Sequence, residues 1–237
     1  MTSKSRENGK KFIELLDKRQ NLEGTKVVNI LLNLSNSNYT VARNYQELTK
    51  IIVTYEKNLS IWDVKNRPKL DSLMREFSRC LHNYLSSVYS LIQHTFIVKS
   101  NLDRIKTCEE FTKKVRILSD NSCITFVKDL RTYSQHIKLP IISSSISISK
   151  NKTNGKNIVK KKILLQKQDI LQWTNWSKSS KDYINSKKEL EFKNILSEYE
   201  KLNREFFNWF YNEATKLYSP ELEEYANLEK ELSRLAP

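Results

Sequence analysis

The chain has 237 residues, of which 38% are hydrophobic and 29% charged, and its formal net charge is +14. This apolar content excludes a disordered chain, and three glycines and four prolines are too few for the turns of a many-stranded β fold. The positive charge either attracts a polyanion such as nucleic acid or only solvates a lysine-rich surface.

Neither a secretory signal nor a membrane helix is expected. The N-terminal stretch 1–11 is polar and leads into an amphipathic helix, and no apolar run approaches the roughly 18–20 residues that a membrane helix needs. Three cysteines have no metal-ligand spacing and cannot all pair, which favours reduced thiols. We therefore expect a cytoplasmic protein with no membrane partner.

The first part of the chain predicts three amphipathic helices. Apolar residues recur at helical spacing within residues 7–19, 25–34 and 40–58. Gly24 separates the first two helices, and the polar stretch 35–38 separates the second from the third.

Residues 68–99 predict the central helix of the protein. Pro68 suits the first turn of a helix. Two rows of apolar side chains then recur every three or four residues along this segment. A helix that is apolar on two faces usually lies in the centre of a bundle. A further helix is expected at residues 104–118.

The stretch Ser122–Pro140 predicts one amphipathic helix that ends at its proline. One face would pack on the core, with Phe126, Val127, Leu130 and Tyr133. Any residue of 119–122, which reads SDNS, could cap its N-terminus.

Residues 141–166 predict a β-hairpin. Isoleucine alternates with serine before an Asn-Gly dipeptide, and a β-branched run follows it. Lysines repeat through this segment without an acidic residue between them. They either keep the hairpin edges from aggregating or form a basic arm along a nucleic-acid backbone.

The C-terminal part predicts the longest helix of the chain at residues 178–217, which carries an aromatic stripe, and a last helix that Ser219 caps. We expect these C-terminal helices, 178–235, to complete the bundle. The predicted fold is therefore mainly α: a single domain over residues 1–237, an up-and-down helical bundle with the hairpin inserted.

Most common catalytic motifs are absent from the sequence. No glycine-rich phosphate loop, no zinc-ligand spacing and no serine nucleophile elbow is present. We therefore expect neither a cofactor nor a metal ion. The remaining chemistry lies in Arg131 and His136, five residues apart, and in a second pair, Arg79 and His82.

The stretch FVKDLRTYSQHIKLP, which contains the first pair, resembles the HEPN superfamily of small helical-bundle proteins. Its ribonucleases carry an arginine, four to six residues and then a histidine at the end of a late helix. Arg131 matches the arginine and His136 the histidine, while Thr132 occupies a polar position where asparagine is commoner. The resemblance implies a metal-independent endoribonuclease, often a toxin or a phage-defence protein, with RNA as substrate, a homodimeric active site and a cognate inhibitor protein.

The residues fit this chemistry without the resemblance. RNA carries its own nucleophile, the ribose 2′-hydroxyl, so cleavage needs an acid, a base and positive charge on the phosphate. Histidine serves as acid or base near neutral pH, and arginine binds phosphate. Five helical residues rotate His136 about 140° away from Arg131. Two copies of the helix across a twofold axis would supply two histidines and two arginines to one cleft, which predicts a homodimer.

Two alternatives remain open at this point. The chain is a non-catalytic nucleic-acid-binding module, in which Lys160, Lys161 and Lys162 contact the backbone with help from Arg79 and His82. Otherwise it is a helical scaffold whose partner is a protein.

Overall fold

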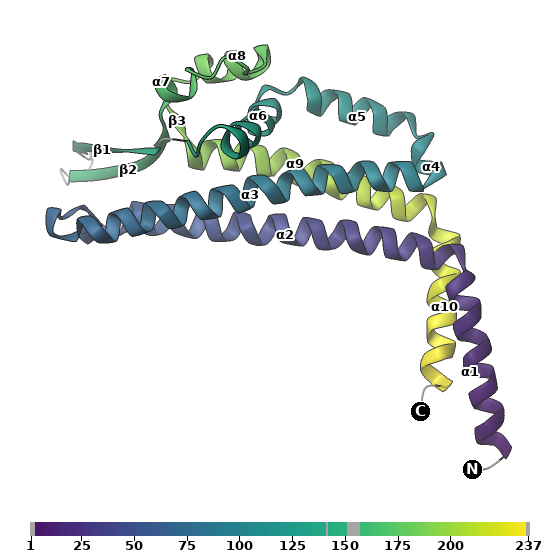
Figure 1. The fold of residues 1–237 in the computed structure, drawn as a ribbon. Helices are drawn as coiled ribbons and strands as arrows, with labels where there is room; N and C mark the ends of the chain where they lie inside the picture. The colour runs from purple at the N-terminus through teal and green to yellow at the C-terminus, as the bar shows by residue number, and fades with distance from the viewer. Residues whose placement is uncertain (1–2, 141, 151–156, 236–237) are drawn as a thin grey trace.

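The computed structural model describes residues 3–140, 142–150 and 157–235, and it shows a mainly α helical bundle with a small antiparallel sheet (Figure 1). The predicted fold class is confirmed at this level. The predicted Asn-Gly turn, at residues 154 and 155, lies outside the described residues.

Two helices of 35 residues each, α2 (Glu23–Lys57) and α3 (Arg67–Asn101), run side by side along the length of the bundle (Figure 1). Two short 3₁₀ turns, Leu59–Trp62 and Val64–Asn66, join them. The expected central helix at residues 68–99 is confirmed as α3, and Pro68 lies in its first turn. Its buried residues include Phe77, Leu81, Tyr84, Leu85, Val88 and Leu91.

The predicted break at residues 35–38 is wrong, because α2 continues through it. The hydroxyls of Ser37 and Thr40 donate to backbone carbonyl oxygens four residues earlier, at distances of 3.0 and 2.9 Å. These polar side chains are therefore satisfied within the helix. Leu34 and Val41, which flank the stretch, continue one buried stripe.

At one end of the bundle, α1 (Ser3–Asn21) and α10 (Ser219–Leu235) project together as a two-helix arm that carries both termini (Figure 1). Gly24 lies where α2 meets α10, and a Cβ atom there would overlap the carbonyl oxygen of Glu221. Glycine therefore permits a close approach of these two backbones. The side chain of Glu221 also pairs with Arg104 at 2.5 Å.

Two helices connect α3 to the helix that carries Arg131 and His136. The helix expected at residues 104–118 divides into α4 (Asp103–Lys106) and α5 (Glu109–Asp120). Next follows α6 (Ser122–His136), which ends four residues before Pro140 rather than at it. Asn121 caps α6, since its Oδ1 accepts from the backbone N–H groups of Cys123 and Ile124 at 2.9 and 3.2 Å.

The expected hairpin is confirmed as β1 (Ile142–Lys150) and β2 (Asn157–Leu165), which pair antiparallel with Ile142 opposite Leu165. A two-residue strand, β3 (Leu190–Glu191), extends the sheet in the order β1-β2-β3. A strand of two residues has no periodicity of its own in the sequence, and this one was not predicted.

The single helix expected at residues 178–217 is wrong. A short helix, α7 (Lys167–Ile170), precedes this segment. Within the segment the chain forms α8 (Lys178–Ser186), then β3, then α9 (Phe192–Leu217). The helix breaks because Leu190 is buried and pairs with Leu165 of the sheet. The last helix is confirmed as α10. No helix in the described part of the chain is long and apolar enough to cross a membrane.

Candidate nucleic-acid site between α3 and α6

The helix α6, which carries the predicted catalytic residues, is held on one side by α8. The carboxylate of Asp129 accepts from the Ser177 backbone N–H at 3.1 Å and from the Ser180 hydroxyl at 2.7 Å. The Ser177 hydroxyl also accepts from the Ser180 backbone N–H and caps α8. Asp129 therefore fixes the start of α8 against the middle of α6.

An aromatic cluster holds the same face of α6. Phe126 stacks on Trp176 and Tyr183 with ring centroids 5.6 and 5.0 Å apart, and Tyr133 stacks on Trp176 at 5.7 Å. The Trp176 indole N–H donates to the carbonyl oxygen of Ile170 at 2.6 Å. The large buried area of these rings holds α6 in one orientation.

The C-terminal half of α6 lies against the middle of α3. Gln135 donates from Nε2 to the Ser86 hydroxyl at 2.9 Å. One turn earlier, the guanidinium carbon of Arg131 lies 4.0 Å from the centroid of the Tyr89 ring. The Arg131 Nε is buried and has no hydrogen-bond acceptor among the described residues. The stacking therefore holds the planar guanidinium in place without an acidic partner.

The other two predicted catalytic residues differ in exposure. His136 is the last residue of α6 and is exposed. Thr132 is half-buried, and its hydroxyl donates along its own helix to the Lys128 carbonyl oxygen at 3.3 Å. His136 is therefore open to a substrate, whereas the Thr132 hydroxyl serves the helix backbone.

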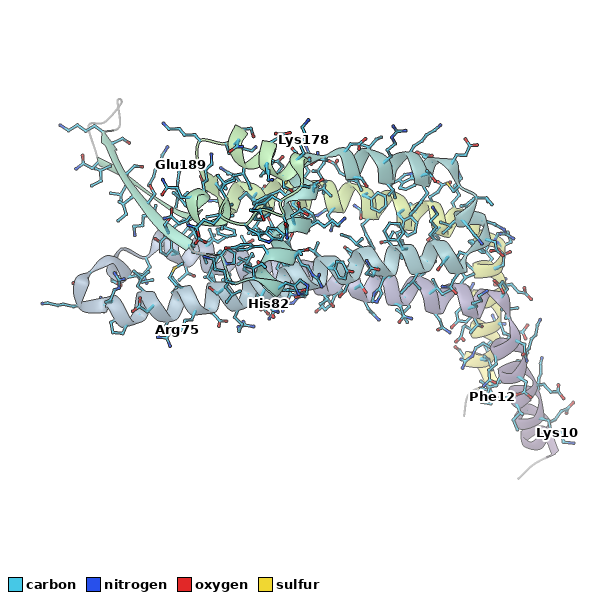
Figure 2. The ribbon with its side chains drawn as sticks, turned by 45° about the horizontal axis from the view of Figure 1, so that its top comes forward. Lys10, Phe12, Arg75, His82, Lys178 and Glu189 are labelled. Atoms are coloured by element: carbon cyan, nitrogen blue, oxygen red, sulfur yellow. The ribbon has the colours of Figure 1, made fainter. Side chains whose placement is uncertain are left out.

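The two α3 residues that contact α6, Ser86 and Tyr89, belong to a row of polar side chains along α3. Arg75, Arg79, His82, Ser86 and Tyr89 are separated in turn by four, three, four and three residues, so they share one face of the helix. Figure 2 shows Arg75 and His82 along α3. Because Ser86 and Tyr89 touch α6, the row leads from the end of α6 toward the start of α3.

Arg75 and Arg79 line a surface groove of about 650 Å³, together with Leu139 and Pro140 just beyond the end of α6. Arg79 pairs with Glu76 at 2.5 Å and with Glu47 at 3.7 Å, and the hydrogen bond to Glu76 raises the pKa of this guanidinium. Arg75 is exposed, and no carboxylate pairs with it among the described residues. Arg75 is therefore better placed than Arg79 to bind a phosphate.

The three hairpin lysines have different surroundings, so they do not form one basic arm. Lys160 is exposed. Lys161 is buried, donates to the Asn58 carbonyl oxygen at 3.1 Å, and burial lowers the pKa of its ammonium group. Lys162 pairs with Glu189 and Glu191 at 3.0 and 3.2 Å, and these contacts raise its pKa.

Ser86 and Tyr89 are the site residues that the sequence analysis missed. Their alternating spacing with Arg79 and His82 was visible in the sequence and could have identified one polar face. Nothing in the sequence indicated that α6 would pack on that face. The described residues hold no group of three or more His, Cys, Asp and Glu side chains that could bind a metal ion.

No family model, curated protein or solved structure matches the chain.

Proposed function

We propose that this protein is a metal-independent endoribonuclease of the HEPN type that acts as a homodimer. One observation carries the proposal: the end of α6 lies against the polar row of α3 through the Gln135–Ser86 hydrogen bond. Leu139 and Pro140, which follow His136 by three and four residues, line the groove together with Arg75. The site is basic on both helices and runs across the surface, as a bound RNA strand requires.

Arg131 supplies positive charge to the phosphate that is attacked. Its guanidinium is permanently protonated, and stacking on Tyr89 holds it in one plane without neutralising it. A carboxylate partner would compete with the phosphate, and none pairs with Arg131 in the described part of the chain. Arg75 lies fourteen residues before Tyr89 on α3, about 21 Å along the helix, so it would hold a phosphate several nucleotides away on the same strand.

His136 takes or gives the protons of the reaction. In one step the 2′-hydroxyl loses its proton to a base as its oxygen attacks phosphorus, and the leaving 5′-oxygen receives a proton from an acid. One imidazole cannot perform both roles at once, so a second His136 from the other protomer supplies the second role. The homodimer is therefore part of the proposed mechanism.

The biological setting follows the resemblance. A ribonuclease of this type would act as a toxin or in phage defence, and a cognate inhibitor protein would bind over the basic site. Such an inhibitor would present acidic groups to Arg75 and Arg131, because complementary charge speeds and orients association.

The test is cleavage of single-stranded RNA by the purified chain in the presence of EDTA. His136→Ala should lower the cleavage rate by about 10²–10⁴-fold, the usual contribution of a general acid or base. His94→Ala is the matched control, since His94 lies on α3 in a separate groove with Ser37 and Thr40. Full cleavage by His136→Ala, with a normal circular dichroism spectrum, would contradict the assignment.

A non-catalytic nucleic-acid-binding module is the second candidate, and the exposed position of Lys160 favours it together with the net charge of +14. It predicts salt-sensitive RNA binding that His136→Ala does not change. Absence of RNA cleavage with retained binding would select this function over the first. Absence of both would leave a scaffold whose partner is a protein.

A further inference from the structure

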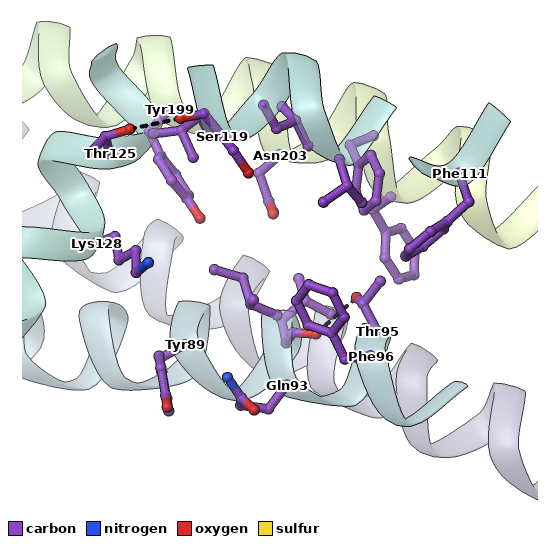
Figure 3. A pocket seen from close by; sticks show the side chains of 17 residues that line it. Tyr89, Gln93, Thr95, Phe96, Phe111, Ser119, Thr125, Lys128, Tyr199 and Asn203 are labelled. Carbon is purple, nitrogen blue, oxygen red and sulfur yellow. Dashed lines mark hydrogen bonds between the residues drawn. The ribbon is translucent and has the colours of Figure 1, made fainter. Parts of the chain in front are cut away.

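A cavity of about 330 Å³ lies between α3, α5, α6 and α9 (Figure 3). This volume falls at the lower end of the roughly 300–1,000 Å³ that is typical of small-molecule sites. Most of its wall is apolar, and Phe96, Phe111 and Phe206 pack against one another at one side of it. The cavity therefore suits a ligand with a short hydrocarbon chain.

Polar groups converge on the same hollow from two helices. The side chains of Tyr199, Asn203 and Lys128 point into it, while Phe111 lies toward the opposite side (Figure 3). Tyr199 is 2% exposed, and its hydroxyl has no hydrogen-bond partner among the described residues. The hydroxyl opens into the cavity, so a ligand that enters there can accept its hydrogen bond in place of water.

The charged side chain at the cavity is basic and favours a negatively charged ligand. Lys128 is exposed at its edge, and no carboxylate pairs with this ammonium group in the described part of the chain. No Asp or Glu is among the described residues that line the cavity. Burial raises the pKa of Tyr199, so its hydroxyl stays protonated and remains a donor. An ammonium, a phenol hydroxyl and an amide N–H together match a carboxylate.

We propose that this cavity binds a small hydrophobic carboxylate of the medium-chain fatty acid class. The carboxylate accepts hydrogen bonds from Lys128, Tyr199 and Asn203, and the hydrocarbon chain extends toward Phe96 and Phe111. The cavity shares Tyr89 with the candidate nucleic-acid site but is separate from the groove that Arg75 lines, and the inference does not depend on ribonuclease activity.

The test is titration of the full chain with decanoate below its micelle concentration, followed by calorimetry. Lys128→Gln should weaken binding by about tenfold, because it removes a charge-assisted hydrogen bond. Lys201→Gln is the matched control, since Lys201 is exposed on α9 and does not line the cavity. Tyr199→Phe should weaken decanoate several-fold, and Lys128→Gln should weaken decanoate much more than the neutral analogue decanol, which has no charge to pair with the ammonium group.

A cavity-filling variant separates this site from adsorption elsewhere. Val115→Phe adds a ring to the cavity wall and should abolish binding of decanoate and decanol, with an unchanged circular dichroism spectrum. Absence of decanoate binding at millimolar concentration would overturn the proposal. Equal binding by the wild-type chain, Lys128→Gln and Val115→Phe would overturn it as well, because the ligand would then occupy another surface.

Discussion

Arg131 and Tyr89 form one of the contacts between the predicted catalytic helix and the polar face of α3. The guanidinium carbon lies 4.0 Å from the ring centroid, and the arginine Nε is buried without an acceptor in the described part of the chain. A guanidinium that is positioned by a ring keeps its charge available for a phosphate. The position of the Arg131 guanidinium therefore depends on a residue of another helix.

Loss of the Tyr89 ring should lower RNA cleavage. A cation–π contact contributes about 0.5–2 kcal/mol, so Tyr89→Leu should reduce the cleavage rate about two- to thirtyfold. Tyr89→Phe keeps the ring and should cleave at nearly the wild-type rate. A rate measured for Tyr89→Leu equal to that of Tyr89→Phe would show that the stacking does not position Arg131.

Substitutions of Lys160 and Lys161 should affect different properties, RNA binding for Lys160 and the free energy of unfolding for Lys161. Lys160→Gln should weaken RNA binding and reduce the slope of log K against log salt by about one, as expected for a lost phosphate contact. Lys161→Gln should instead lower the free energy of unfolding by about 1 kcal/mol, since it alters the contact with Asn58. Binding titrations at several salt concentrations and urea unfolding test the pair. A reversed pattern would contradict the surroundings described for these two lysines.

Gly24 and Gly9 should respond in opposite directions to alanine. A Cβ at Gly24 overlaps the carbonyl oxygen of Glu221, so Gly24→Ala should lower the free energy of unfolding by about 1–3 kcal/mol. Nothing lies within 4 Å of a Cβ at Gly9 within helix α1. Gly9→Ala should therefore stabilise the chain by about 0.5–1 kcal/mol through helix propensity. Urea unfolding measures the free energy of unfolding of both variants. An equal decrease for Gly24→Ala and Gly9→Ala would show that α2 and α10 do not pack as described.

Glu200 should make the stability of the fold depend on pH. This carboxyl is 6% exposed and accepts a hydrogen bond from the Tyr84 hydroxyl at 3.5 Å. Burial raises the pKa of Glu200 above the ordinary 4.5, although the hydrogen bond from Arg204 lowers it in part. The folded state then binds a proton more readily than the unfolded state. The contribution of Glu200 to the free energy of unfolding therefore falls as pH rises from about 4.5 through the folded pKa.

Glu200→Gln removes this titration and keeps an oxygen that accepts from Tyr84. The difference in unfolding free energy, variant minus wild type, should increase as pH rises above 4.5 and then level off. Glu205→Gln, exposed on the same helix, should show a much smaller change. Urea unfolding at a series of pH values checks this, and a flat difference for Glu200→Gln would refute the effect of burial.

Local patterns in the sequence determined the helical class, the central helix α3, the hairpin and the last helix. Each of these elements has a signal within its own residues: two apolar rows with Pro68 in α3, alternating isoleucines in the hairpin, and the Ser219-Pro220 pair at the start of α10. The position of Arg131 and His136 on one amphipathic helix was also visible. Periodicity and caps act over a few residues, so the sequence alone carries them.

Tertiary contacts decided the rest. The polar stretch 35–38 stays helical because flanking leucine and valine are buried against neighbouring helices, and the chain leaves the helix at residue 187 because Leu190 pairs with β2. Packing also determines that Lys161 is buried while Lys160 is exposed, and that Arg131 lies on Tyr89. These outcomes depend on residues that are distant in the sequence, and no local pattern specifies which distant surfaces will meet.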